Sequence, residues 1–83
     1  GPDTRVLIIR MRGVPAMDMT ALRSLKKIHA LCKKKGITLI LSHVKEQPLH
    51  MMEKAGFADE VGRENFCANI DASIARAQEI ELG

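Results

Sequence analysis

The sequence has no tryptophan, no tyrosine and only two phenylalanines among its 83 residues. With so few aromatic side chains, Leu, Ile, Val, Met and Ala must fill the interior, which favours helices packed on an aliphatic sheet. A chain of this length has enough interior for one hydrophobic core and no more. We therefore expect residues 1–83 to form a single domain.

Cysteine is also scarce, and the two cysteines, Cys32 and Cys67, have no CxxC spacing. Reduced thiols are the simplest interpretation. His29, His43 and His50 have no metal-ligand spacing with one another or with the cysteines. We therefore predict no metal site and no cofactor.

Long hydrophobic runs are missing too. No apolar run approaches the roughly 18 residues that a membrane helix needs, and the chain does not open with a signal peptide. If the parent protein touches a membrane, we expect it to do so through residues outside this sequence.

The charge is only mildly basic, with 13 Lys and Arg against 10 Asp and Glu. A nucleic-acid binder usually adds stacking aromatics or a recognisable motif to its basic patch, and neither is present. We therefore predict no nucleic-acid partner. The lysines before Gly36 are interpreted as a solvated helix end, with a patch for anionic lipid as the alternative.

What is present begins with the stretch from Val6 to Ala21. Its first half, VLII, is a continuous apolar run of the kind found in strands that are covered on both faces. We expect this strand to lie inside a sheet and not at its edge. Gly13 and Pro15 end it. Asp18 is placed as the N-cap of the next helix, because its carboxylate can accept from the free N–H groups of the first turn.

A basic amphipathic helix follows and ends at Gly36. Its apolar residues recur at the helical period and are Leu22, Leu25, Ile28, Leu31 and Cys32. Ile37 to Val44 is a second apolar run of strand length. Together the three segments predict a βαβ unit with parallel strands and a right-handed crossover.

The second half of the chain predicts two more helices and a short strand. The first helix lies between Lys45 and Gly56, with Pro48 in its first turn. Phe57 to Val61 is expected to be a third strand and Gly62 to Asn69 a loop. Ile70 to Leu82 is expected to be a closing helix. The residues predicted to face inward from the two helices are Leu49, Met52, Ala55, Ile70, Ile74, Ala77 and Ile80.

Several segments resemble the STAS domain, which anti-sigma-factor antagonists share with the cytoplasmic C-terminal part of sulphate permease (SulP) anion transporters. VLIIRMRGVPAMDMTAL resembles the hydrophobic strand and the Asp-x-Ser/Thr-Gly/Ala helix start of that family. The segments more similar to the transporter branch are Val44-Lys45-Glu46-Gln47-Pro48-Leu49, Glu53-Lys54-Ala55-Gly56-Phe57, Gly62-Arg63-Glu64-Asn65 and Asn69-Ile70-Asp71-Ala72.

The resemblance implies an α/β, STAS-like fold with a mainly parallel sheet and helices. STAS domains normally begin with a further strand and, in transporters, a helix, which this sequence lacks. We therefore expect the first native strand or strands to lie outside residues 1–83. A bare sheet edge can pair with another chain, so a homodimer is one state that the sequence allows.

The implied function is that of a non-catalytic regulatory or protein-interaction domain of a sulphate-type anion transporter, at the cytoplasmic side of an inner membrane. Its partners would be other proteins and the transporter's own membrane domain, with an anion or a nucleotide as a further ligand. The alternative is a soluble switch, similar to the anti-sigma-factor antagonists, that is phosphorylated on Thr20.

The start of the helix after the first strand is the candidate site. Asp18, Met19, Thr20 and Ala21 form it, and Arg12 is a neighbour that could help to receive an anion. Thr20 matches the position that antagonist-type STAS domains present to a kinase, where the helix N-terminus would hold the phosphate. We favour the simpler interpretation that Thr20 supports the cap. The chain has no Gly-rich phosphate loop.

No acid, base and nucleophile occur at a recognisable spacing, so we predict that the chain is not an enzyme. Cys32 on the inner helix face and Ser42 in a buried strand are poor positions for a nucleophile. His43 is expected to be packed or hydrogen-bonded within its strand. Met51 and Met52 are interpreted as core filler.

Overall fold

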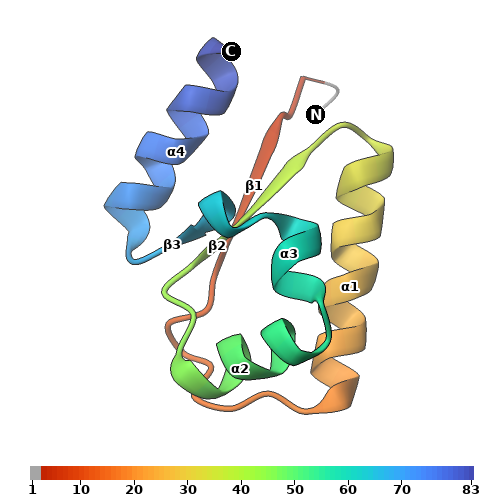
Figure 1. Ribbon diagram of the computed structural model, residues 1–83. Coiled ribbons are helices and arrows are strands. Elements are labelled where there is room, and N and C mark those ends of the chain that lie inside the picture. Colours follow the sequence, from red (N-terminus) through yellow and green to blue (C-terminus); the bar gives the residue numbers. More distant parts are fainter. Residues whose placement is uncertain (1–2) are drawn as a thin grey trace.

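The computed structural model describes residues 3–83, which form a three-stranded sheet between helices (Figure 1). In chain order, the elements are β1 (Val6–Arg10), α1 (Met19–Lys34), β2 (Thr38–Ser42), α2 (Glu46–Lys54), α3 (Phe57–Val61), the 3-10 turn η1 (Arg63–Asn65), β3 (Phe66–Cys67) and α4 (Ile70–Leu82). None of the helices in the described part of the chain is both long enough and apolar enough to cross a membrane.

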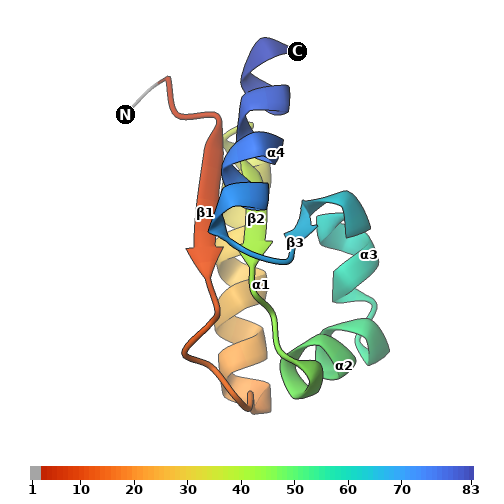
Figure 2. The same cartoon turned by 90° about the vertical axis from the view of Figure 1, so that its left-hand side faces the viewer.

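The sheet has the order β1-β2-β3, and both pairings are parallel. Val6 lies opposite Thr38, and Arg10 lies opposite Ser42. Helices α1 and α4 lie on opposite faces of the sheet (Figures 1 and 2). The predicted parallel βαβ unit is therefore confirmed, as is the α/β fold class.

The position of β1 differs from the prediction, because β1 lies at an edge of the sheet and not inside it. Within residues 3–83, no strand pairs with its outer side, and Leu7 is 38% exposed. Apolar residues on both faces of a strand indicate that both faces are covered by other elements. They do not indicate whether another strand pairs with the edge of that strand.

The main core lies between the sheet and helices α1, α2 and α3. Leu39 and Leu41 of β2 meet Leu22 and Leu25 of α1 there. Phe57 is fully buried, and its ring packs edge-on against His29 at 5.4 Å between centroids. Burial of each large apolar side chain contributes about 1.5–3 kcal/mol to folding.

The inward stripe of α1 is narrower than predicted. Leu22, Leu25 and Cys32 are buried as expected, but Ile28 and Leu31 are exposed. A three- and four-residue apolar spacing marks a broad face of a helix. Only the side of that face that carries Leu22, Leu25 and Cys32 is covered here.

Phe57 to Val61 is helix α3 and not the predicted strand, and the third strand is instead Phe66–Cys67, within the predicted loop. Gly56 ends α2 in the left-handed conformation, with φ of 75°. In α3 the buried residues are Phe57, Ala58 and Val61, a spacing that places all three on one side of a helical turn. A segment of five residues is too short for its periodicity to separate helix from strand.

Two predicted inward-facing residues point to solvent. In α2, Pro48 and Met52 are buried and Leu49 is half-buried, whereas Ala55 is exposed. In α4, Ile74 is 46% exposed, and Ser73 is fully buried beside it. Ser73 tolerates burial because its hydroxyl donates to the Asn69 carbonyl at 2.9 Å.

Candidate functional site

The loop between β1 and α1 is tied to the body of the protein at both ends. Met11 continues the strand pairing, because its N–H donates to the Ser42 carbonyl at 2.8 Å. The N–H of Val14 then donates to the Met11 carbonyl at 3.0 Å, which closes a turn. Further along, Met17 is only 8% exposed and packs in the core. The loop therefore delivers the next residue, Asp18, to a fixed place.

Gln47, in the first turn of α2, holds the end of this loop. Its Oε1 accepts from the Met17 N–H at 2.6 Å, and its Nε2 donates to the Met17 carbonyl at 3.1 Å. One side-chain amide thus satisfies both polar groups of a single backbone residue. As a result, the start of α2 sets the position of the start of α1.

Asp18 is the N-cap of α1, as predicted. Its Oδ1 accepts from the Ala21 N–H at 2.8 Å, and its backbone is extended, as an N-cap requires. The Leu22 N–H donates to the Asp18 carbonyl at 3.0 Å and begins the helical ladder. The carboxylate also places a negative charge at the positive end of the helix dipole.

The structure brings Asp18, Met19, Thr20 and Ala21 together at the tip of α1 and places Arg12 elsewhere. Thr20 is exposed, Met19 is 52% exposed and Ala21 is half-buried. Arg12 instead lines a hollow at the carboxyl ends of β1 and β2, which it shares with residues of α4.

Beside the α1 tip lies a shallow groove of about 360 Å³ between α1 and α2. Its lining residues are Met19, Leu22, Gln47, His50, Met51, Lys54 and Ala55. Sequence reasoning missed Gln47 and His50 as part of this surface, because they come from α2 and no local pattern links α2 to the start of α1. Met51, interpreted as core filler, is half-buried and packs against the core, and it also lines the groove.

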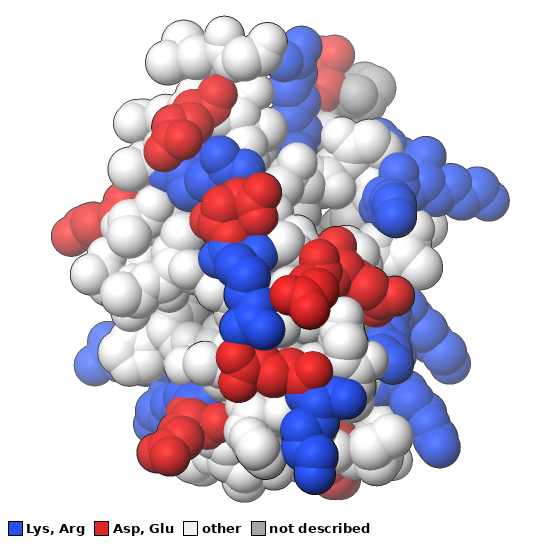
Figure 3. Space-filling view, viewed as in Figure 1, with Lys and Arg blue, Asp and Glu red and all other residues white. Residues whose placement is uncertain are grey.

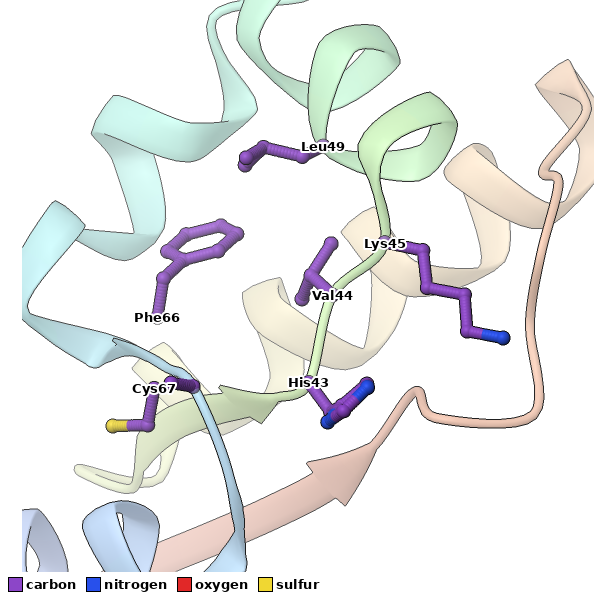
Figure 4. A pocket seen from close by; sticks show the side chains of 7 residues that line it. His43, Val44, Lys45, Leu49, Phe66 and Cys67 are labelled. Carbon is purple, nitrogen blue, oxygen red and sulfur yellow. The ribbon is translucent and has the colours of Figure 1, made fainter.

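A second hollow, of about 430 Å³, follows the carboxyl ends of β2 and β3 (Figure 4). Val44, Leu49 and Phe66 face one another across it, while Lys45 points away. His43, expected to be packed or hydrogen-bonded within its strand, donates its N–H to the Cys67 carbonyl at 2.8 Å, but its side chain is exposed and its backbone is left-handed with φ of 56°. The packed alternative was wrong because β2 ends at Ser42, and the next residue turns the chain toward α2.

Both cysteines are free, and Cys32 is buried whereas Cys67 is half-buried. Cys32 is 5% exposed, and burial raises the pKa of its thiol, with the nearby Lys35 opposing the shift. A raised pKa keeps the thiol protonated and unreactive at neutral pH. Met52 is fully buried, which confirms its role in the core. Residues 3–83 contain no group of three His, Cys, Asp or Glu side chains placed to hold a metal ion.

The charges on the face shown in Figure 3 are interleaved, with basic and acidic side chains alternating down the middle of the molecule. One such arrangement links α2 to α3, where Arg63 donates to both Glu53 and Asp59. Both hydrogen bonds raise the pKa of Arg63, and the one with Glu53 has the larger effect. The middle of this face therefore carries no uniform patch of one sign.

Comparison with known proteins identifies the family. The STAS domain family model matches residues 2–77. The crystal structure of a sulfate transporter family protein from Wolinella succinogenes superimposes with a TM-score of 0.90 at 32% sequence identity, over 95% of this chain. The match spans 65% of that protein's chain. No curated protein matches the sequence. With its parallel sheet, its capped α1 and a family match over nearly its whole length, the chain belongs to the STAS domain family.

Proposed function

We propose that this STAS domain is a non-catalytic regulatory domain of a sulphate-type anion transporter and that it contacts a protein partner through the tip of α1. Its similarity to a sulfate transporter family protein supports the transporter assignment. The observation that carries the proposal is the exposed Met19, which stands beside Thr20 on a tip held by Asp18 and Gln47.

A fixed apolar contact is efficient for binding. An interface loses affinity when loops and side chains must be ordered on association, and here the loop is already ordered by the two hydrogen bonds between Gln47 and Met17. Met19 adds a flexible apolar side chain next to the groove floor formed by Leu22 and Met51. The polar side chains of Gln47 and His50 complete the lining.

The partner in this proposal is the transporter's own membrane domain, with this domain on the cytoplasmic side of the inner membrane. An anion is a poor occupant for the α1 tip, because the Asp18 carboxylate already accepts from the Ala21 N–H. Its negative charge would also repel an incoming anion. We therefore assign protein contact alone to this tip.

Sulphate uptake by cells that express the full-length transporter tests the proposal. Met19→Asp places a charge in the proposed contact and should reduce uptake at least severalfold. Ile74→Asp is the matched control, because Ile74 is a similarly exposed apolar residue on α4, and it should leave uptake near the wild-type level. Equal uptake by both variants at equal membrane levels would contradict the proposal.

The second candidate is a phosphorylation switch on Thr20, and the exposure of Thr20 at the second position of α1 favours it. A phosphate there would be attached covalently, so it would stay near the N-terminal N–H groups of the helix even though the Asp18 carboxylate repels it. Incubation with a cognate kinase, followed by mass spectrometry, should then find the phosphate on Thr20. Modification elsewhere, or none, would remove this candidate.

A further inference from the structure

The carboxyl ends of β1 and β2 carry two polar residues on one face of the sheet. Arg10 lies directly opposite Ser42 in the parallel register. Side chains alternate between faces along a strand. Because Leu39 and Leu41 belong to the core on the α1 side, Ser42 and its neighbour Arg10 are on the face that α4 covers. The two side chains therefore meet where α4 begins.

A hollow of about 260 Å³ lies at this place. Its lining residues are Arg10, Arg12, Ser42, His43, Asn69 and Ile70. Neither Arg10 nor Arg12 forms an ion pair with any carboxylate of residues 3–83, whereas Arg63 and Arg76 both do. The hollow thus has two positive charges and no negative one in its lining.

Ser42 supplies an independent sign of a ligand. The residue is 99% buried, yet its hydroxyl has no hydrogen-bond partner within residues 3–83. Every fully buried side-chain N or O atom of the described residues has a partner, so the small accessible remainder of Ser42 includes its hydroxyl, which opens into the hollow. A nearly buried hydroxyl without a partner is unfavourable and is well matched by an acceptor in the hollow.

Helix α4 starts at the same hollow and has 13 residues, enough for a full helix dipole. Its N-cap, Asn69, accepts from the Ala72 N–H at 2.8 Å. The N–H groups of Ile70 and Asp71 have no acceptor in the described part of the chain. The Asp71 carboxylate is exposed and opposes an anion in this turn, but it does not line the hollow, and the two arginines outweigh it in charge.

From these observations we propose that the hollow binds a tetrahedral oxyanion of the sulphate or phosphate class. Arg10 and Arg12 would neutralise its charge, the Ser42 hydroxyl would donate to one oxygen, and the first N–H groups of α4 would donate to others. The site lies apart from the α1 tip, so it does not depend on the function proposed above.

Titration of the 83-residue chain with sodium sulphate and with sodium phosphate, followed by amide NMR at constant ionic strength, tests the proposal. The amide signals of Ile70 and Asp71 should shift in a saturable manner, while sodium chloride should leave them unchanged. Arg10→Gln and Arg12→Gln should each weaken binding about tenfold, as loss of a charged hydrogen bond predicts. Arg5→Gln is the control, because Arg5 precedes β1 and lies outside the hollow, and it should bind normally.

Asn69→Asp separates charge from folding. Aspartate caps a helix as well as asparagine does, so α4 should stay intact, but the added negative charge should abolish binding. Titration with ATP distinguishes a free ion from a phosphoryl group on a nucleotide. If ATP saturates the hollow at a lower concentration than phosphate does, the ligand is a nucleotide. If only the inorganic ions saturate it, the ligand is a free oxyanion. Identical responses of Arg5→Gln and Arg10→Gln, or no saturation with any oxyanion, would overturn the proposal.

Discussion

Gln47 and Met17 are 30 positions apart in the sequence and are joined by two hydrogen bonds, of 2.6 and 3.1 Å. In the first, the Met17 N–H donates to the side-chain oxygen of Gln47. In the second, the side-chain N–H of Gln47 donates to the Met17 carbonyl. This pair connects α2 to the loop before α1, so the tip of α1 has one orientation. The proposed contact through Met19 depends on that orientation.

Replacing Gln47 with alanine should therefore destabilise the domain by about 1–3 kcal/mol, because two partly buried backbone groups lose their partners. Urea denaturation followed by circular dichroism measures the free energy of unfolding. Gln78→Ala is the control, because Gln78 is exposed on α4 and should change that free energy by less than about 0.5 kcal/mol. An equal loss in both variants would show that the Gln47 hydrogen bonds contribute little.

Asp18→Ala should cost about 1 kcal/mol of stability, because the Ala21 N–H loses the cap that accepts from it. Asp18→Asn keeps an oxygen in the same place and should cost much less. Thermal unfolding of the two variants and the wild type provides the comparison. If both variants lose the same stability, the charge of Asp18 and not its cap hydrogen bond is what stabilises α1.

Local patterns were sufficient to predict the elements that have strong local signals. The cap at Asp18, the stop at Gly36 and the closing helix Ile70–Leu82 all match the structure. The parallel βαβ unit does so as well, because two apolar strands and a long amphipathic helix leave few other arrangements. In each of these cases, neighbouring residues contain the physical cause.

Features that depend on distant residues could not be predicted in this way. Nothing near Gln47 indicates that its amide binds Met17, and nothing near Arg12 indicates that it shares a hollow with Asn69 instead of the α1 tip. The segment Phe57–Val61 failed for a different reason, since five residues are too few for a period to distinguish strand from helix.

The thiol of Cys32 should make stability fall at alkaline pH. Burial holds its pKa above the ordinary value, so the unfolded chain releases this proton at lower pH than the folded chain does. The resulting stability is fully present below the pKa of the unfolded thiol, about 8.5, and is lost as pH rises through the folded pKa.

Free energies of unfolding for the wild type and for Cys32→Ala, measured from about pH 7 to about pH 10, test this point. The wild type should lose more stability over that range than the variant. If the free energies of unfolding of the two proteins change in parallel with pH, the predicted contribution of the Cys32 thiol would be contradicted. Under native conditions a thiol reagent should also modify the half-buried Cys67 before Cys32.

The free edge of β1 should support self-association at high protein concentration, because its backbone groups face no strand of residues 3–83. Sedimentation velocity should show a concentration-dependent dimer for the wild type and a monomer for Leu7→Lys, since a lysine on an edge strand discourages pairing. Leu82→Lys, at the far end of α4, should dimerise normally. A wild type that stays monomeric, or a Leu7→Lys variant that still dimerises, would refute edge pairing.

Photo-crosslinking in the proposed full-length transporter tests the central claim most directly. A benzophenone amino acid at position 19 should link the tip of α1 to the membrane domain, while the same group at position 74, on α4, should give little product, although Met19 and Ile74 are similarly exposed. Linkage from position 74 with none from position 19 would contradict the claim that the α1 tip is the contact surface.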